Sequence, residues 1–149
     1  MSNLEAVDRA ILRELLVDGR CTLTDLAERV GLSVSAVHQR VRRLEQRGVV
    51  HGYAAKIDHD EIGLPLTALI SLKPIDPAAP DDYPTRLQHL QQIESCYSVA
   101  GDVSYVLLVR VASPGGLEEL LRQIREAANV STSTTVVLST PYEHRPPAV

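Results

Sequence analysis

The polar and basic side chains that follow Ser33 suggest the clearest chemistry in this chain. Residues 33–53 contain four arginines and one glutamate, although the whole chain carries a net charge of −4. If residues 33–47 form a helix with Val37, Val41 and Leu44 buried, the opposite face carries amide and guanidinium groups. Glutamine can pair with adenine, and arginine can pair with guanine or bind a phosphate. This face predicts DNA binding, and the alternative is an ordinary solvated helix. Its outward residues are expected to be Ser35, Gln39, Arg42, Arg43 and Gln46, with His38 to one side.

Two short helices joined by a glycine turn are expected to position this face. Thr22 is an expected N-cap with Asp25 at the third helical position, so a helix should run from Leu23 to Val30. Gly31 should end it, and Ser33 should cap the next helix. This arrangement is a helix-turn-helix.

A longer helix should precede this pair. We expect it to end at Asp18-Gly19, with Gly19 in the left-handed conformation. After Gly48, residues 49–54 read as an extended wing or hairpin, in which either His51 or Tyr53 contacts the DNA backbone or Tyr53 only packs against the domain. The apolar stripe of the first helix is Leu4, Val7, Ile11, Leu12, Leu15 and Leu16.

The run from Asp8 to Asp58 resembles the DNA-binding signature of the Lrp/AsnC (feast/famine) family of bacterial transcriptional regulators. The decisive stretches are LAERVGLS at 26–33 and RVRRLEQRGVV at 40–50. The resemblance implies that Ser33 to Arg43 is the recognition helix and that the partner is a double-stranded DNA operator. Arg40 flanks the buried stripe, so a salt bridge with Asp8 or Asp25 competes with a phosphate contact. The implied DNA-binding residues are Ser33, Ser35, Ala36, His38, Gln39, Arg40, Arg42 and Arg43.

The rest of the chain reads as strand, helix, two strands, helix and strand. The expected order is the ferredoxin-like βαββαβ fold, so the whole chain is α+β with a winged helix-turn-helix first. The expected domains are residues 1–53 for DNA binding, 54–65 as linker, and 66–149 for ligand binding and oligomerisation. The expected strands are 66–72, 96–100, 105–111 and 134–138; the first helix carries Leu87, Leu90 and Ile93, and the second starts after Ser113-Pro114.

One face of this sheet should lack helices, and it needs another layer because strands 105–109 and 135–138 are apolar on both faces. Packing against a second subunit would supply that layer. The resemblance implies homo-oligomers: dimers that assemble further into tetramers or octamers.

The turn from Val99 to Tyr105 resembles the effector-binding turn of the same family. There, backbone groups around the glycine hold a small molecule, usually an amino acid. The family commonly has an acid where Ser104 stands, so either Asp102 meets a ligand ammonium group or the ligand preference differs. A plain hairpin turn is the alternative, and residues 129–132 of another subunit would form the facing wall. The implied effector-binding residues are Val99, Ala100, Gly101, Asp102, Ser104 and Tyr105.

Other functions have weaker support in the sequence. His59 lies among Asp58, Asp60 and Glu61, but adjacent linker residues rarely converge on one ion, so we expect neither a metal nor a cofactor. No hydrolase, phosphate-binding or metalloprotease motif occurs. The remaining alternatives are an architectural DNA-compacting protein and an enzyme similar to siroheme decarboxylases. Without a membrane-span or signal-peptide pattern, we expect a cytoplasmic, nucleoid-associated protein.

Overall fold

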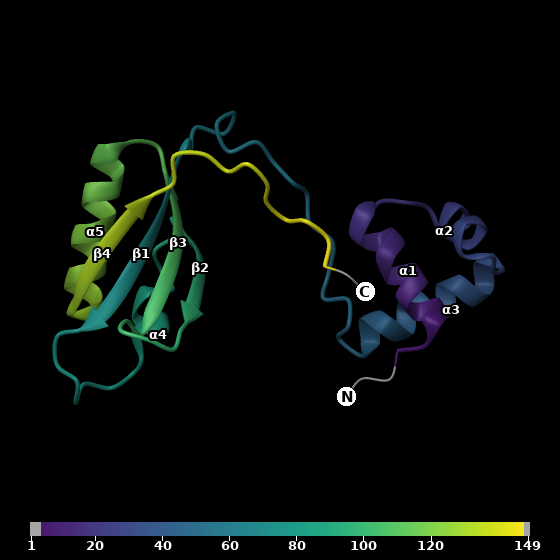
Figure 1. The fold of residues 1–149 in the computed structure, drawn as a ribbon, viewed down its shortest axis with the longest axis horizontal. Coiled ribbons are helices and arrows are strands. Elements are labelled where there is room, and N and C mark those ends of the chain that lie inside the picture. Colours follow the sequence, from purple (N-terminus) through teal and green to yellow (C-terminus); the bar gives the residue numbers. More distant parts are fainter. Residues whose placement is uncertain (1–3, 148–149) are drawn as a thin grey trace. The chain divides into compact units, whose positions relative to one another are not determined.

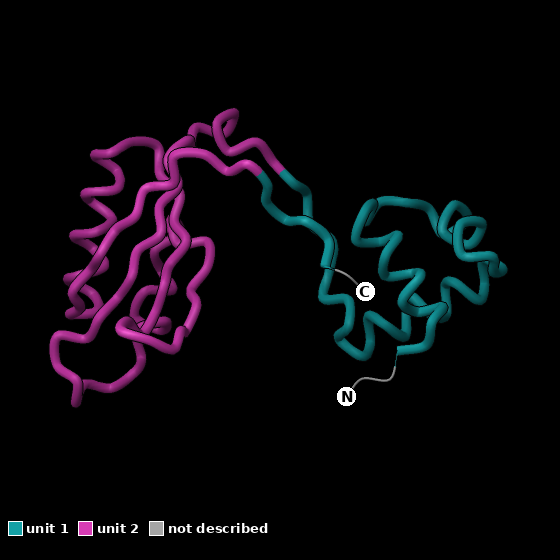
Figure 2. Tube along the Cα trace, viewed as in Figure 1, with its two compact units in different colours: residues 1–56, 142–149 teal, residues 57–141 magenta. Residues whose placement is uncertain are grey.

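The computed structural model describes residues 4–147, which divide into two compact units (Figure 2). Of the described residues, the first unit contains 4–56 and 142–147, and the second contains 57–141. No helix among residues 4–147 is long and apolar enough to cross a membrane.

The first unit consists of three helices: α1 (Ala6–Val17), α2 (Leu23–Val30) and α3 (Val34–Gln46) (Figure 1). They confirm the helix-turn-helix prediction. Leu4, Val7 and Leu15 pack partly buried against the core, whereas Leu16 is exposed. The core is formed by Ile11, Leu12, Leu26, Ala27, Val37, Val41 and Leu44.

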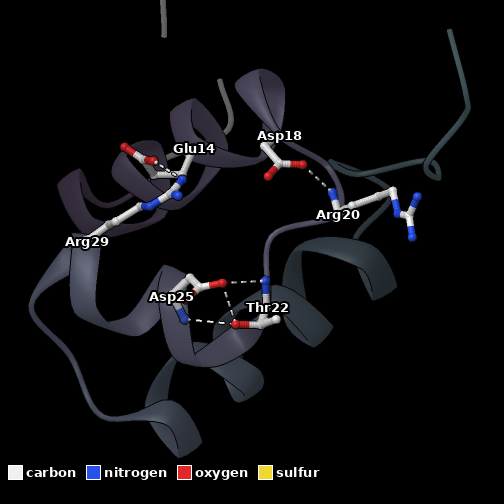
Figure 3. A network of polar contacts seen from close by, with 6 residues as sticks. All are labelled: Glu14, Asp18, Arg20, Thr22, Asp25 and Arg29. Carbon is white, nitrogen blue, oxygen red and sulfur yellow. Dashed lines mark hydrogen bonds and ion pairs between the residues drawn. The ribbon is translucent and has the colours of Figure 1, made fainter.

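Local hydrogen bonds fix the start of α2 and the turn into α3. The hydroxyl of Thr22 accepts a 3.1 Å hydrogen bond from the backbone N–H of Asp25, and the Asp25 carboxylate accepts from the N–H of Thr22 at 3.4 Å (Figure 3). Gly31 adopts a left-handed φ of 70°, and the Ser33 hydroxyl caps α3 by accepting from Ala36 N–H at 3.2 Å. The predicted caps are therefore confirmed.

One prediction about the ends of this unit is wrong, and for another the structure decides between two alternatives. α1 ends at Val17, its C-cap Asp18 is extended with a φ of −140°, and Gly19 does not adopt the predicted left-handed conformation. Gly19 is instead a site of close approach: a Cβ there would lie 3.2 Å from Cδ1 of Tyr53. Of the expected extended wing or hairpin at residues 49–54, the hairpin is absent. The N–H groups of Val49 and Val50 both donate to the carbonyl of Leu44 and turn the chain back onto α3, and residues 51–58 then continue without regular secondary structure.

The second unit is a four-stranded antiparallel sheet whose strands lie in the order β2 (Ile93–Ser98), β3 (Tyr105–Val111), β1 (Leu66–Pro74) and β4 (Val130–Val136). One core contains side chains of both helices and of the same face of β1 and β3, so both helices cover that face. This topology confirms the ferredoxin-like prediction. The two helices are α4 (Tyr83–Leu87), which follows β1, and α5 (Pro114–Ala128), which follows β3.

Several boundaries differ from those expected. α4 is a single turn, and Ile93, expected on that helix, is the first residue of β2, which ends at Ser98. β4 begins four residues early because Asn129 adopts a left-handed φ of 52° directly after α5 and turns the chain into the sheet. Leu138, expected in the last strand, lies beyond it and is 96% exposed.

The uncovered face of the sheet is less apolar than expected. Leu69 on β1 and Leu108 on β3 are opposite each other there, together with Val106. Thr135 pairs with Leu69, so the same face of β4 presents the hydroxyl groups of Ser131, Ser133 and Thr135. The prediction of a last strand apolar on both faces is wrong, because β4 begins four residues and ends two residues before the expected strand 134–138.

Candidate functional site

The outward face of α3 carries the side chains predicted to contact DNA. The buried stripe of Val37, Val41 and Leu44 fixes the orientation of the helix against the core. On the other side the structure brings together six exposed side chains: Ser35, His38, Gln39, Arg42, Arg43 and Gln46. Ser33 is the N-cap, and Ala36 is half-buried beside it.

Arg40 is placed differently from the other predicted residues. Its Nη1 lies 2.8 Å from Oδ1 of Asp8, and its Nη2 lies 3.0 Å from Oε2 of Glu5, both at the start of α1. Asp8 is only 3% exposed, so this guanidinium compensates a buried carboxylate. The hydrogen bond to Asp8, followed by that to Glu5, raises the pKa of Arg40. Of the two alternatives for Arg40, the structure contains the salt bridge.

The guanidinium groups of Arg42 and Arg43 are available for contacts with a ligand. Among residues 4–147, neither guanidinium has a hydrogen bond or an ion pair. Both side chains are exposed on the same helix as Gln39. An exposed amide flanked by unpaired cations can combine contacts to base edges with contacts to phosphates.

Of the two alternatives for Tyr53, the structure contains packing against the domain, through a contact with α3 that the sequence did not specify. The hydroxyl of Tyr53 donates a 2.9 Å hydrogen bond to Oε1 of Glu45 on α3. The two residues line a hollow of about 440 Å³. Cys21 is also in that hollow, and partial burial raises the pKa of its thiol. A tyrosine shortly after the glycine that ends α3 was the only sequence signal for this contact. The other lining residues are Leu15, Gly19, Leu23, Leu26, His38, Val41 and Arg42.

The predicted effector turn connects β2 and β3 in the second unit. The N–H of Val99 donates to the carbonyl of Ser104 at 3.1 Å, and the N–H of Ser104 donates to the carbonyl of Leu72 at 2.9 Å, which ties the turn to β1. Gly101 has a φ of 146°, and no atom lies within 4 Å of where its Cβ would be. Asp102 is exposed, and its side chain has no polar partner among the described residues.

Tyr105 and Ser104, both predicted to bind the effector, are less exposed than residues 100–102 of the same turn. Tyr105 is 7% exposed, and its ring packs edge-on against Tyr83 with a centroid separation of 6.0 Å. Ser104 is half-buried. The accessible part of the turn is therefore centred on Ala100, Gly101 and Asp102.

The polar linker directs its histidine toward the sheet. Nε2 of His59 lies 3.5 Å from Oε1 of Glu94. Glu94 also accepts from Nε of Arg110, whose Nη1 donates to Thr67 at 2.9 Å. No group of three His, Cys, Asp or Glu residues among 4–147 is placed to hold a metal ion.

Comparison with known proteins identifies both units. A winged helix-turn-helix DNA-binding model matches residues 4–51, and an Lrp/AsnC ligand-binding-domain model matches residues 67–147. The chain belongs to the Lrp/AsnC family.

Relatives with this two-part organisation cover nearly the whole chain. The HTH-type transcriptional regulator LrpA of Mycobacterium tuberculosis is 57% identical over 95% of each chain. The leucine-responsive regulatory protein of Escherichia coli is 35% identical over 91% of this chain and 85% of its own. A feast or famine regulatory protein from M. tuberculosis, solved with L-methionine, superposes with a TM-score of 0.94 at 56% identity, over 97% and 98% of the chains. The chain is a DNA-binding transcriptional regulator of the Lrp/AsnC type.

Proposed function

We propose that this Lrp/AsnC regulator binds its operator through the outward face of α3 as a homo-oligomer. The observation that supports this most directly is the exposed Gln39 flanked by the unpaired Arg42 and Arg43. Arg40 holds α3 on α1 through Asp8 and contributes to binding by positioning the helix. The remaining proposed contacts are made by Ser33, Ser35, Ala36 and His38.

We further propose a free amino acid as the effector, bound at Val99, Ala100, Gly101, Asp102, Ser104 and Tyr105. The methionine complex of the M. tuberculosis relative supports this ligand class. Backbone N–H groups near Gly101 would take the carboxylate, because no side chain blocks their approach. Asp102 would take the ammonium group, since Ser104 offers only a hydroxyl.

Assembly through the uncovered sheet face follows from the same proposal. Leu69, Val106 and Leu108 supply its apolar centre, and a second copy would remove them from water. Dimers formed this way would associate into tetramers or octamers. We assign residues 1–53 to DNA binding, 54–65 to the linker and 66–149 to sensing and assembly, in a cytoplasmic, nucleoid-associated protein without enzymatic activity.

Footprinting of DNA fragments selected from a genomic library tests this function. Purified full-length protein should protect discrete sites, and an amino acid should change that protection. Uniform coverage of all fragments would instead indicate an architectural protein. A bound chromophore together with no binding to DNA would indicate an enzyme.

A further inference from the structure

Tyr53 is attached to the first unit on two sides. Its hydroxyl donates to Glu45 on α3 at 2.9 Å, and its ring lies so close to Gly19 that a Cβ there would be 3.2 Å from Cδ1. Partial burial and the hydrogen bond to Glu45 raise the pKa of Tyr53 to about 12. The ring lines two hollows, of about 440 and 460 Å³. Tyr53 therefore connects α3 with the turn after α1.

The chain around Tyr53 has few other attachments. The N–H of Val50 donates to the carbonyl of Leu44, and the next main-chain N–H to donate a hydrogen bond is that of Asp60, which donates to the side chain of Asp58. Between them, in residues 51–57, the only hydrogen bond is that of the Tyr53 hydroxyl. Val49 and Val50 also pack against the core, so beyond them the hydrogen bond of this side chain is the polar attachment that holds the chain where it leaves the first unit.

The acceptor of that bond lies on the recognition helix. Glu45 comes two residues after Arg43, on the same helix as Gln39 and Arg42. A tether anchored to α3 keeps a fixed relation between the DNA-reading face and the exit of the linker. In a symmetric dimer, paired recognition helices must meet half-sites about 34–36 Å apart or a multiple of that. If the start of the linker is held against α3, the two recognition helices of a dimer can reach only a limited range of separations.

We propose that Tyr53 is a positioning residue that fixes the linker exit relative to α3 and so sets the operator half-site spacing that the protein accepts. The proposal rests on the proposed function, since it requires binding to paired half-sites. Tyr53 acts through Glu45 and Gly19 and touches no base. Loss of the Tyr53–Glu45 hydrogen bond should weaken the preference of the protein for one half-site spacing, and it should leave the affinity for a single half-site unchanged.

The test compares full-length wild type with Tyr53→Phe, Glu45→Ala and Glu45→Gln. Glutamine keeps an acceptor oxygen for the tyrosine hydroxyl. Tyr142→Phe is the matched control, because Tyr142 is an exposed tyrosine of the same unit. Fluorescence anisotropy measures binding to the footprinted operator, to duplexes with the half-site spacing changed in single base-pair steps, and to a single half-site. Thermal unfolding verifies that each variant is folded.

Tyr53→Phe and Glu45→Ala should bind a single half-site within about twofold of wild type. Their preference for the native spacing over one changed by half a helical turn should fall by about two- to tenfold, the range of one net hydrogen bond. Glu45→Gln and Tyr142→Phe should keep the wild-type preference. An unchanged preference in both anchor variants overturns the proposal, and so does an equal loss on the single half-site, which would mean direct DNA contact. If the wild type has no operator, the proposed function fails as well.

Discussion

Nη1 of Arg40 lies 2.8 Å from Oδ1 of Asp8, joining α3 to α1. Asp8 is buried, whereas Arg42 and Arg43 are exposed and without polar partners among the described residues. Three arginines within four positions of one helix therefore divide into one that stabilises the unit and two that face solvent.

Arg40→Ala should destabilise the first unit. An unsatisfied buried polar group costs about 1–3 kcal/mol, and the buried carboxylate of Asp8 would lose its cationic partner. In urea denaturation, the free energy of unfolding of Arg40→Ala should be lower than that of wild type by about 1–3 kcal/mol. Arg43 is exposed, so the free energy of unfolding of Arg43→Ala should stay within about 0.5 kcal/mol of wild type. Equal stability of the two variants would contradict the structural role of Arg40.

Gln39→Ala and Arg43→Ala should weaken DNA binding in different ways. Loss of the amide should relax base preference at one operator position by about 1–3 kcal/mol. Loss of the guanidinium should weaken binding to all sequences and reduce the salt dependence by about one unit per lost phosphate contact. Anisotropy titrations at several salt concentrations measure both effects, with Gln91→Ala as an exposed control in the second unit. Wild-type binding by both variants would exclude α3 as the reading helix.

A fragment of residues 60–149 should be at least dimeric at micromolar concentration. Leu108→Glu should shift the full-length protein toward monomers, because it places a charge in the apolar centre of the uncovered sheet face. Sedimentation velocity measures both, and Gln91→Glu outside the sheet is the control. A monomeric wild-type fragment would remove the basis for assembly through this face.

Asp102→Ala should abolish the thermal shift produced by the amino acid that stabilises wild type. A ligand at 100 times its Kd adds about 2.7 kcal/mol of stability, and the variant should lose this gain because the ammonium group of the ligand has no carboxylate partner. Operator binding without ligand should persist. In Gly101→Trp, the indole ring should fill the proposed ligand site. Because this substitution can also disturb assembly, the oligomeric state of the variant is measured by sedimentation velocity. Calorimetry showing equal binding by wild type and both variants would place the site elsewhere.

The capping box of α2 should make the stability of the first unit depend on pH through the carboxylate of Asp25. Hydrogen bonds from the side chain and backbone of Thr22 lower the pKa of Asp25. Because the folded pKa is the lower one, this contribution is present above the usual aspartate pKa and disappears as the pH falls through the folded value. The difference in Tm between wild type and Asp25→Asn should therefore be largest near neutral pH and shrink in acid. A difference that is the same at every pH would rule out this origin.

The sequence by itself determined the elements whose signals are local. α2 spans the predicted residues Leu23–Val30 because a capping box and Gly31 define its ends within a few positions. α5 begins at Pro114, one residue before the predicted start after Ser113-Pro114, and the hydroxyl of Ser113 caps it by accepting from Gly116 N–H. The outward face of α3 was also predictable, since helical periodicity separates it from a clear apolar stripe.

The tertiary structure decided what depends on residues distant in sequence. Whether Arg40 meets a phosphate or a carboxylate depends on Asp8, 32 positions earlier. The role of Gly19 depends on the ring of Tyr53, and the composition of the uncovered sheet face depends on the register of β4 against β1. Capping and periodicity involve neighbours in the chain, whereas ion pairs, close approaches and strand register are selected by packing among separate elements.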